Sequence, residues 1–146
     1  MKRLILLAVP LALAVSPAHS KGMKWMDGTA AGLPAGATFA VVKGDPSKAA
    51  DFVIRAKFPA NYTVPPHHHP TDEVVRVLGA GTLAYGMGDK VDASNAGSLV
   101  KGYHVTMQAN MDHWVTTTDP LEIEVSGMGP FQIIYADPKD DPRGAK

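Results

Sequence analysis

The sequence predicts an all-β domain, a sandwich or barrel of the jelly-roll type. Glycine (14) and proline (12) are frequent among the 146 residues, while charged residues make up only 19%. That composition is typical of many short strands joined by tight turns. Eight segments with strand character follow one another at intervals of about ten residues, and no long helical periodicity occurs after residue 20.

The first predicted strands lie at 38–43 and 51–58, separated by a turn signal at 44–47. The second segment, DFVIRAKF, alternates strictly, which predicts a half-buried strand with one apolar face. That face carries Phe52, Ile54, Ala56 and Phe58. A turn is predicted at 59–62, and Pro65 with Pro66 stiffens the chain that follows.

Six further strands are predicted along the rest of the chain. They cover residues 73–78, 81–87, 103–108, 113–118, 121–125 and 131–136. Gly79–Gly81 and Asp119–Pro120 are turn signals between them, and 88–97 is predicted to be a polar loop. The domain therefore runs over 38–136 as a β-barrel, preceded by an extension at 21–37 and followed by a polar tail at 137–146.

Residues 1–20 have the features of a secretory signal peptide. Lys2 and Arg3 precede an apolar run from Leu4 to Val15, and small residues at 18 and 20 predict cleavage after Ser20. The alternative is a membrane anchor, but the run is shorter than the roughly 20 residues that a spanning helix needs. We expect a periplasmic or secreted protein without a membrane segment after cleavage.

Charge and cysteine content exclude several classes of function. Cleavage would remove two of the 14 basic residues and none of the 14 acidic ones, leaving a net charge of about −2. No basic patch for nucleic acid or an anionic membrane is expected on such a chain. The chain has no cysteine, so disulfides, thiolate metal sites and a cysteine nucleophile are all excluded.

The segment PPHHHPTDE at 65–73 predicts a metal site. Along an extended chain, His67, His69 and Glu73 share one face because they stand at i, i+2 and i+6. A third imidazole, His113, lies in a later strand region. Three neutral imidazoles and one carboxylate suit a divalent Mn, Fe, Co, Ni or Zn ion with positions left open for water or substrate.

Other interpretations of these residues stay open. The histidines could form a surface cluster or be satisfied polar residues of the core, and Asp72 could coordinate in place of Glu73. Asp72 and His68 fall on the opposite face by the same alternation. His68 could then serve as a hydrogen-bonding partner rather than a ligand.

The same residues resemble the two motifs of the cupin superfamily. His67, His69, Glu73 and Gly79 match the first motif. Gln108, Asn110, His113 and Thr117 stand where the second motif reads Pro-x-Gly-x₂-His-x₃-Asn, so only its histidine is kept. Asn110 can supply the left-handed turn that glycine normally supplies there.

The resemblance to small, exported, single-domain bacterial cupins covers nearly all of the chain after residue 20. It is carried by GDPS at 44–47, PPHHHPTDE at 65–73, GMGDKVD at 86–92, GPF at 129–131 and DPKDDPR at 137–143. The resemblance implies a double-stranded β-helix, a metal on His67, His69, Glu73 and His113, and often a homodimer. It implies no particular reaction, and in some cupins the glutamate acts as a base instead of a ligand.

Two functions are predicted from this site. The first is a metal-dependent enzyme, an oxygenase or an isomerase or decarboxylase, acting on a small organic molecule with Glu73 as its catalytic proton carrier. The second is a periplasmic protein that binds a metal or a small ligand without turnover. Tyr85, Met87, Met107, Met111 and Trp114 are expected in the barrel core, some of them beside the metal.

Overall fold

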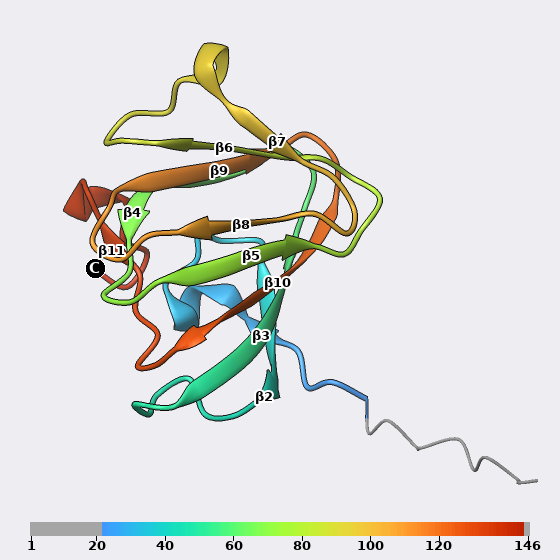
Figure 1. Cartoon of the computed structure of the whole chain (residues 1–146), viewed down its shortest axis with the longest axis vertical. Coiled ribbons are helices and arrows are strands. Elements are labelled where there is room, and N and C mark those ends of the chain that lie inside the picture. The colour runs from blue at the N-terminus through green and yellow to red at the C-terminus, as the bar shows by residue number, and fades with distance from the viewer. Residues whose placement is uncertain (1–21, 145–146) are drawn as a thin grey trace, which may run out of the picture.

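The computed structural model describes residues 22–144, so the predicted signal peptide at 1–20 lies outside the described residues. The described part contains eleven strands and three short 3-10 helices. The strands are β1 (Met26–Asp27), β2 (Thr38–Lys43), β3 (Asp51–Phe58), β4 (Tyr62–His68), β5 (Glu73–Val77), β6 (Leu83–Met87), β7 (Gly97–Leu99), β8 (His104–Met107), β9 (His113–Thr117), β10 (Leu121–Met128) and β11 (Ile134–Tyr135) (Figure 1). The helices are η1 (Gly28–Ala31), η2 (Ala93–Asn95) and η3 (Pro138–Asp140). Within these residues, no helix is long and apolar enough to cross a membrane.

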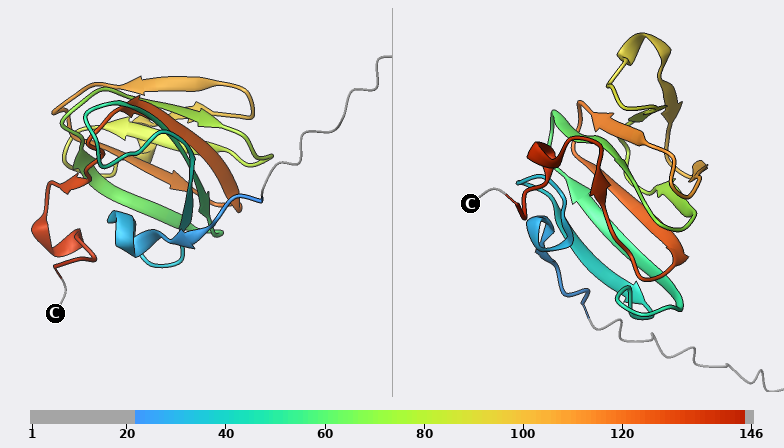
Figure 2. Two further views of the ribbon diagram at one scale, coloured as in Figure 1. Left: turned by 90° about the horizontal axis from the view of Figure 1, so that it is seen from below. Right: turned by 90° about the vertical axis from the view of Figure 1, so that its left-hand side faces the viewer.

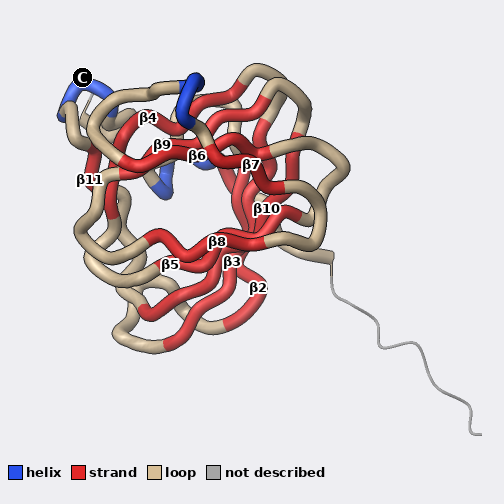
Figure 3. The backbone as a smooth tube through the Cα atoms, turned by 45° about the horizontal axis from the view of Figure 1, so that its top comes forward, coloured by secondary structure: helices blue, strands red, loops and turns tan. Residues whose placement is uncertain are grey.

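The strands form two antiparallel sheets. Sheet A has the order β1-β2-β3-β10-β5-β8, and sheet B has the order β11-β4-β9-β6-β7. The two sheets curve around a common centre, as the tube in Figure 3 and the turned views in Figure 2 show. The predicted all-β jelly roll is confirmed.

The centre of sheet A is the ladder between β3 and β10, in which all eight residues of each strand are paired. The predicted alternation of β3 is confirmed, since the four residues of its apolar face are all buried. On the outer face, the Arg55 guanidinium lies 3.6 Å from Glu122 Oε1 and 3.3 Å from Glu124 Oε2. The alternation of side chains along these strands thus places apolar residues inside the barrel and charged residues outside it.

A β-bulge in β4 decides which histidines face the interior. Val64 pairs with Val115 and His67 pairs with His113, so three steps along β4 oppose two steps along β9. The additional residue lets Val64 and His67 both face inward, although strict alternation would put them on opposite faces. The bulge holds Pro65 and Pro66, which cannot donate to a regular ladder and are tolerated at such a position.

The two terminal segments close one end of the barrel and meet there. The hydroxyl of Tyr62 donates to Pro34 O at 2.6 Å, and that of Tyr135 donates to Gly32 O at 2.7 Å. Arg143, in the predicted C-terminal tail, donates to Ile133 O at 2.6 Å. Its guanidinium lies against Gly32, where a Cβ atom would come within 2.9 Å of it.

Several predicted elements were wrong or incomplete. Residues 62–68 were not predicted as a strand, and they form β4. The predicted polar loop at 88–97 contains η2 and the first residue of β7. The strand predicted at 131–136 is reduced to β11, because its first residues cross from one sheet toward the other.

We expect Tyr135→Phe to lower the free energy of unfolding by about 1 kcal/mol, because it removes the buried donor to Gly32 O. Urea unfolding followed by fluorescence measures this effect. Tyr103→Phe is the matched control, since that side chain is 67% exposed. If both substitutions lower the free energy of unfolding equally, the hydrogen bond from Tyr135 to Gly32 O does not stabilise the contact between the N-terminal segment and the barrel.

Candidate metal centre

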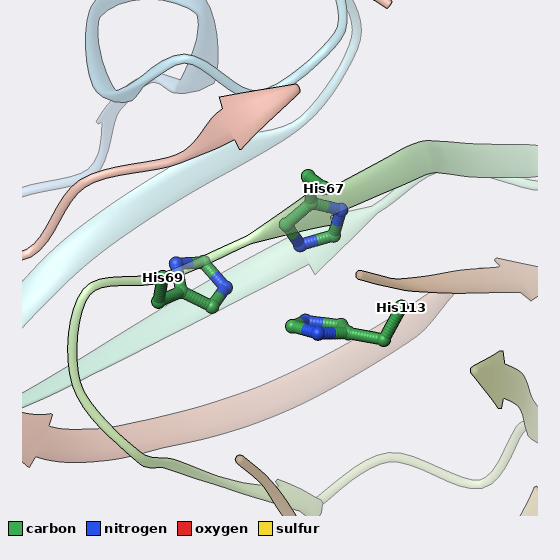
Figure 4. A group of neighbouring side chains, drawn as sticks. All are labelled: His67, His69 and His113. Carbon is green, nitrogen blue, oxygen red and sulfur yellow. The ribbon is translucent and has the colours of Figure 1, made fainter. Parts of the chain in front are cut away.

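Three histidines from sheet B converge inside the barrel. His67 lies on β4, His69 follows the end of β4, and His113 begins β9. Their side chains are 5%, 4% and 1% exposed. One ring nitrogen from each can be chosen so that all three lie within 4.8 Å of one another (Figure 4).

Backbone carbonyls fix the orientation and the tautomer of all three rings. The Nδ1 atom lies 2.6 Å from Pro65 O in His67, 2.6 Å from Gln132 O in His69 and 3.0 Å from Met111 O in His113. A carbonyl oxygen only accepts, so each Nδ1 must carry the proton and donate. Each Nε2 is therefore left with a free lone pair, which is the arrangement that metal-binding imidazoles show.

Burial keeps the three imidazoles neutral. It lowers the pKa of His69 to about 4 and lowers that of His67 well below its usual value, with the neighbouring His113 adding to the effect. Burial also lowers the pKa of His113. A neutral imidazole is the form that binds a metal, so the cluster needs no deprotonation before binding at neutral pH.

Glu73 comes to the cluster from the other sheet. The chain turns at 70–72 between β4 of sheet B and β5 of sheet A, and Glu73 begins β5. Its carboxyl group is buried, and burial raises its pKa to about 7. The prediction that 67–73 is one extended segment is therefore wrong, although Glu73 does face the histidines.

The contact between Glu73 and His69 needs a proton or a cation between the two groups. Glu73 Oε2 lies 3.0 Å from His69 Nε2. With the His69 proton on Nδ1, a lone pair of Nε2 faces the carboxyl oxygen, and neither atom has a hydrogen-bond partner. Such a pair is stable only with a proton or a cation between the two atoms.

These donors fit a divalent transition metal. Three Nε2 lone pairs and a carboxylate oxygen are the nitrogen and oxygen ligands such ions take, and a cation there would satisfy the two buried atoms that lack partners. Among the described residues, His67, His69 and His113 form the one group of three or more potential ligands. Glu73 stands beside this triad and approaches it through His69.

Asp72 and His68, the two neighbouring residues considered above, form contacts of their own away from the triad. Asp72 Oδ1 accepts from Ala109 N at 2.8 Å, so this carboxylate is engaged away from the triad. His68 turns outward, and its Nδ1 lies 2.7 Å from Asp112 Oδ1. The hydrogen-bonding role considered for His68 is thus its observed one.

The turn before His113 joins the two motif segments. Asn110 has a φ of 58°, which confirms the predicted left-handed turn. Its backbone N–H donates to His69 O at 2.8 Å. This bond, together with the one from Ala109 to Asp72, sets His113 against the segment that carries His67 and His69.

A cavity of about 40 Å³ lies in the interior next to the cluster. His67, His69, Glu73 and His113 are its polar lining residues, and the others are all Ala, Val, Leu, Ile or Phe. Leu33 from the terminal segment is among them, so the end described above also closes this cavity. Its interior is therefore polar at the histidine cluster and apolar elsewhere.

The residues expected beside the metal do not line this cavity. Met107 and Trp114 are buried core residues, as predicted, whereas Met87 and Met111 are 48% and 46% exposed, so the prediction that these two lie in the core is wrong. Tyr85, Met87 and Trp114 border a separate hollow on the side of η2. The parity of β9 explains the error, because Trp114 follows the inward-facing His113 and so points to the other face of sheet B.

Sequence reasoning missed the groups that hold the imidazoles. Pro65 and Met111 each stand two residues before their histidine, a local spacing that could have been noticed. Gln132 is 63 residues from His69, and it acts through its carbonyl, which no side-chain pattern reveals. Phe131 was also missed, and its ring stacks on that of His69 with a centroid distance of 5.3 Å.

Comparisons of the fold with solved structures found clear likenesses. The polyketide cyclase RemF from Streptomyces resistomycificus matches with a TM-score of 0.66 and 16% identity, over 87% of this chain and 89% of that one. An RmlC-like cupin from Shewanella frigidimarina matches with 0.59 and 13%, over 76% and 87%. A structure of oxalate oxidase matches with 0.58 and 20%, over 88% and 68%.

No protein-family model and no curated protein matches the sequence. At these identities the structural likeness shows the fold, which is the cupin fold, as the two motif segments predicted. Its buried three-histidine cluster suggests a metal site.

Proposed function

We propose that this cupin-fold protein is an exported metalloprotein that holds one divalent transition metal on His67, His69 and His113, with Glu73 as the fourth ligand or as a base beside it. We further propose that it is an enzyme for a small organic molecule. The reaction would be of the oxygenase type or of the isomerase or decarboxylase type. The metal would be Mn, Fe, Co, Ni or Zn.

One observation carries the metal assignment. Three backbone carbonyls accept the Nδ1 protons, so three free Nε2 lone pairs are left on imidazoles that lie close together in the buried interior. A purely structural cluster would need donors for these lone pairs, because buried acceptors without partners are destabilising. Neither His69 Nε2 nor Glu73 Oε2 has a hydrogen-bond partner among the described residues, and only a cation or a proton held by Glu73 would satisfy both atoms.

A metal bound there supplies Lewis acidity toward a ligand oxygen, and with iron or manganese it also supplies redox chemistry. The residues of the chain have separate roles around it. The three imidazoles orient the ion through their fixed tautomers. Glu73, whose Oε2 lies 3.0 Å from His69 Nε2, would be placed to accept or release a proton beside the ion. The apolar walls exclude water from the reacting atoms.

Two of the structural neighbours support an enzyme rather than a passive binder. They are described as a polyketide cyclase and an oxalate oxidase, so the fold hosts catalysis in proteins of similar architecture. The second candidate is a protein that binds a metal or small ligand without turnover. The small volume of the cavity favours it, since it leaves room for only a small bound group.

Export and oligomeric state are part of the proposal. The features of residues 1–20 support a cleaved signal peptide and a periplasmic or secreted protein. Export is tested by the N-terminal sequence of protein recovered from the periplasm or medium, which should begin at Lys21. A homodimer is implied only by the cupin resemblance, and analytical ultracentrifugation tests it.

Protein purified without a histidine tag or chelators should carry close to one transition metal per chain by elemental analysis. Glu73→Gln should keep the metal but weaken its binding by about 10-fold to 100-fold, because the carboxylate charge is lost. Glu122→Gln, on the outer face of sheet A, is the matched control and should bind metal normally. Absence of metal, and no uptake on reconstitution with any of the five ions, would disprove the metal centre.

Turnover assays distinguish an enzyme from a protein that only binds a metal or a small ligand. Oxygen consumption and product analysis of the iron form, against a panel of small acids, phenols and thiols, should identify a reaction that Glu73→Gln slows by about 100-fold or more. If no compound of the panel is turned over with any metal, although the metal site is fully occupied, the protein that binds without turnover would be favoured.

A further inference from the structure

The cavity next to the histidine cluster is selective by its polarity. Polar groups line it only where His67, His69, Glu73 and His113 meet, and no Ser, Thr, Asn, Gln or Tyr among residues 22–144 lines it elsewhere. A ligand atom away from the cluster therefore contacts only carbon. A second polar group on the ligand would lose its water without gaining a partner, which is unfavourable.

The charge of the cavity is equally restrictive. No Lys or Arg within the described residues lines it, and Glu73 is its one acidic residue. With three neutral imidazoles, Glu73 ionised as the fourth ligand and a divalent ion, the centre carries a single net positive charge. An uncompensated charge in an apolar interior is strongly unfavourable, so one negative charge on a ligand would balance the site and two would not.

The size of the cavity limits the ligand further. A volume of about 40 Å³ has room for about three water molecules. Ala56 on β3, Val64 on β4 and Ile123 on β10 border the apolar part, and all three are at most 4% exposed. A ligand that fits has a polar head and a tail of about one or two carbons.

We propose that the cavity binds a short monocarboxylate or an equivalent small monoanion, with its charged head at the metal and its tail between Ala56, Val64 and Ile123. This inference rests on the proposed metal function and names the ligand class of the same site. Dicarboxylates, sugars and cationic metabolites are excluded by the unpartnered polar groups or the unbalanced charge they would bring. Longer fatty acids are excluded by size.

The test uses the cobalt(II) form of the full-length mature chain, whose visible absorption reports on the metal environment. Propionate should change the cobalt spectrum and bind saturably. Malonate, which has the same carbon number with a second carboxylate, should bind at least 10-fold more weakly, and so should octanoate. Calorimetry on the zinc form should give the same order.

Substitutions of residues that line the cavity test where the carbon tail of the ligand lies. Ala56→Leu should weaken propionate binding at least 10-fold while leaving cobalt content and the binding of formate unchanged, because formate has no tail. Ala60→Leu, on the exposed turn after β3, is the matched control and should bind both anions normally. If Ala56→Leu does not fold, Val64→Ile gives the same comparison with one added methylene.

The outcomes separate failure of the metal site from failure of the ligand assignment. Failure to take up cobalt or zinc would overturn the metal function, and this inference with it. Normal metal uptake with malonate binding as tightly as propionate, or with propionate binding unchanged in Ala56→Leu, would overturn the ligand assignment alone.

Discussion

His67→Ala combined with His113→Ala is expected to abolish metal binding, with metal content falling from about one per chain to near zero. The two residues are paired across β4 and β9, and their ring centroids lie 4.4 Å apart. Removing both leaves His69 as the one imidazole of the triad. Elemental analysis after dialysis measures the loss directly.

The same double variant should lose the stabilisation that metal gives the native state. At a free metal concentration 1,000-fold above the dissociation constant, that stabilisation is about 4 kcal/mol. For a chain of this size, its loss lowers the melting temperature by on the order of 10 °C. The comparison must include both proteins with chelator present, because the substitutions also leave cavities.

His68→Ala and His104→Ala are the controls for this experiment. His68 stands between two of the proposed ligands but turns outward to Asp112, and His104 is exposed on the edge strand β8. Both variants should keep about one metal per chain. Unchanged metal content in the double variant, or its loss in His104→Ala, would show that the site lies elsewhere.

Acidification should destabilise the metal-free protein between pH 6.5 and pH 4. Burial lowers the pKa values of His67, His69 and His113 below the unfolded value of 6.5. Groups with depressed pKa values favour the folded state above the unfolded pKa, and this contribution is lost as the pH falls. For His69, with a pKa of about 4, the loss is about 3 kcal/mol at pH 4.

Glu73 acts in the opposite direction over an overlapping range. Its pKa is raised from 4.5 to about 7, so its contribution is full below pH 4.5 and is lost as the pH rises through 7. This rise in pKa corresponds to about 3 kcal/mol, which offsets the contribution of roughly one histidine. The other two histidines remain uncompensated, so the net effect of acid is destabilising.

Urea unfolding at pH 7.5, 6.5, 5.5 and 4.5, with chelator present, measures this dependence. His69→Gln should flatten the decline, whereas Glu73→Gln should steepen it by removing the opposing contribution. His104→Gln is the matched control at an exposed imidazole. Stability that is constant from pH 6.5 to 4.5 in the wild-type protein would contradict burial of neutral histidines.

The parts of the fold that follow from alternation were predictable. Strands β3 and β10 each bury one face, so apolar and polar residues alternate in their sequences, and this alternation indicates an extended strand. In β4 the bulge interrupts the alternation of inward and outward side chains. The two prolines in the bulge, Pro65 and Pro66, are also more typical of loops than of strands. Alternation from Tyr62 and Val64 would have put Pro66 and His68 inside, so the inward direction of His67 required the structure.

The ligand residues were predictable because a metal site demands particular side chains at particular spacings. The remainder of the site was not. The Gln132 carbonyl reaches His69 through the fold, and any residue supplies a carbonyl. The cavity walls come from both sheets, the N-terminal segment and the connection between β10 and β11, so its size depends on packing between elements far apart in the chain.

The strand order of sheet A has a consequence for how the chain matures. Strand β10 lies between β3 and β5, so the central ladder cannot form until nearly the whole chain is available. Pairings this distant in sequence slow folding, to a range of milliseconds to seconds in comparable all-β domains. The triad likewise needs β9 to join β4, so an unfinished chain offers His67 and His69 without His113. For the proposed metal function, loading would therefore follow folding, and a chain exported before it folds, as proposed above, would take its metal from the compartment it enters.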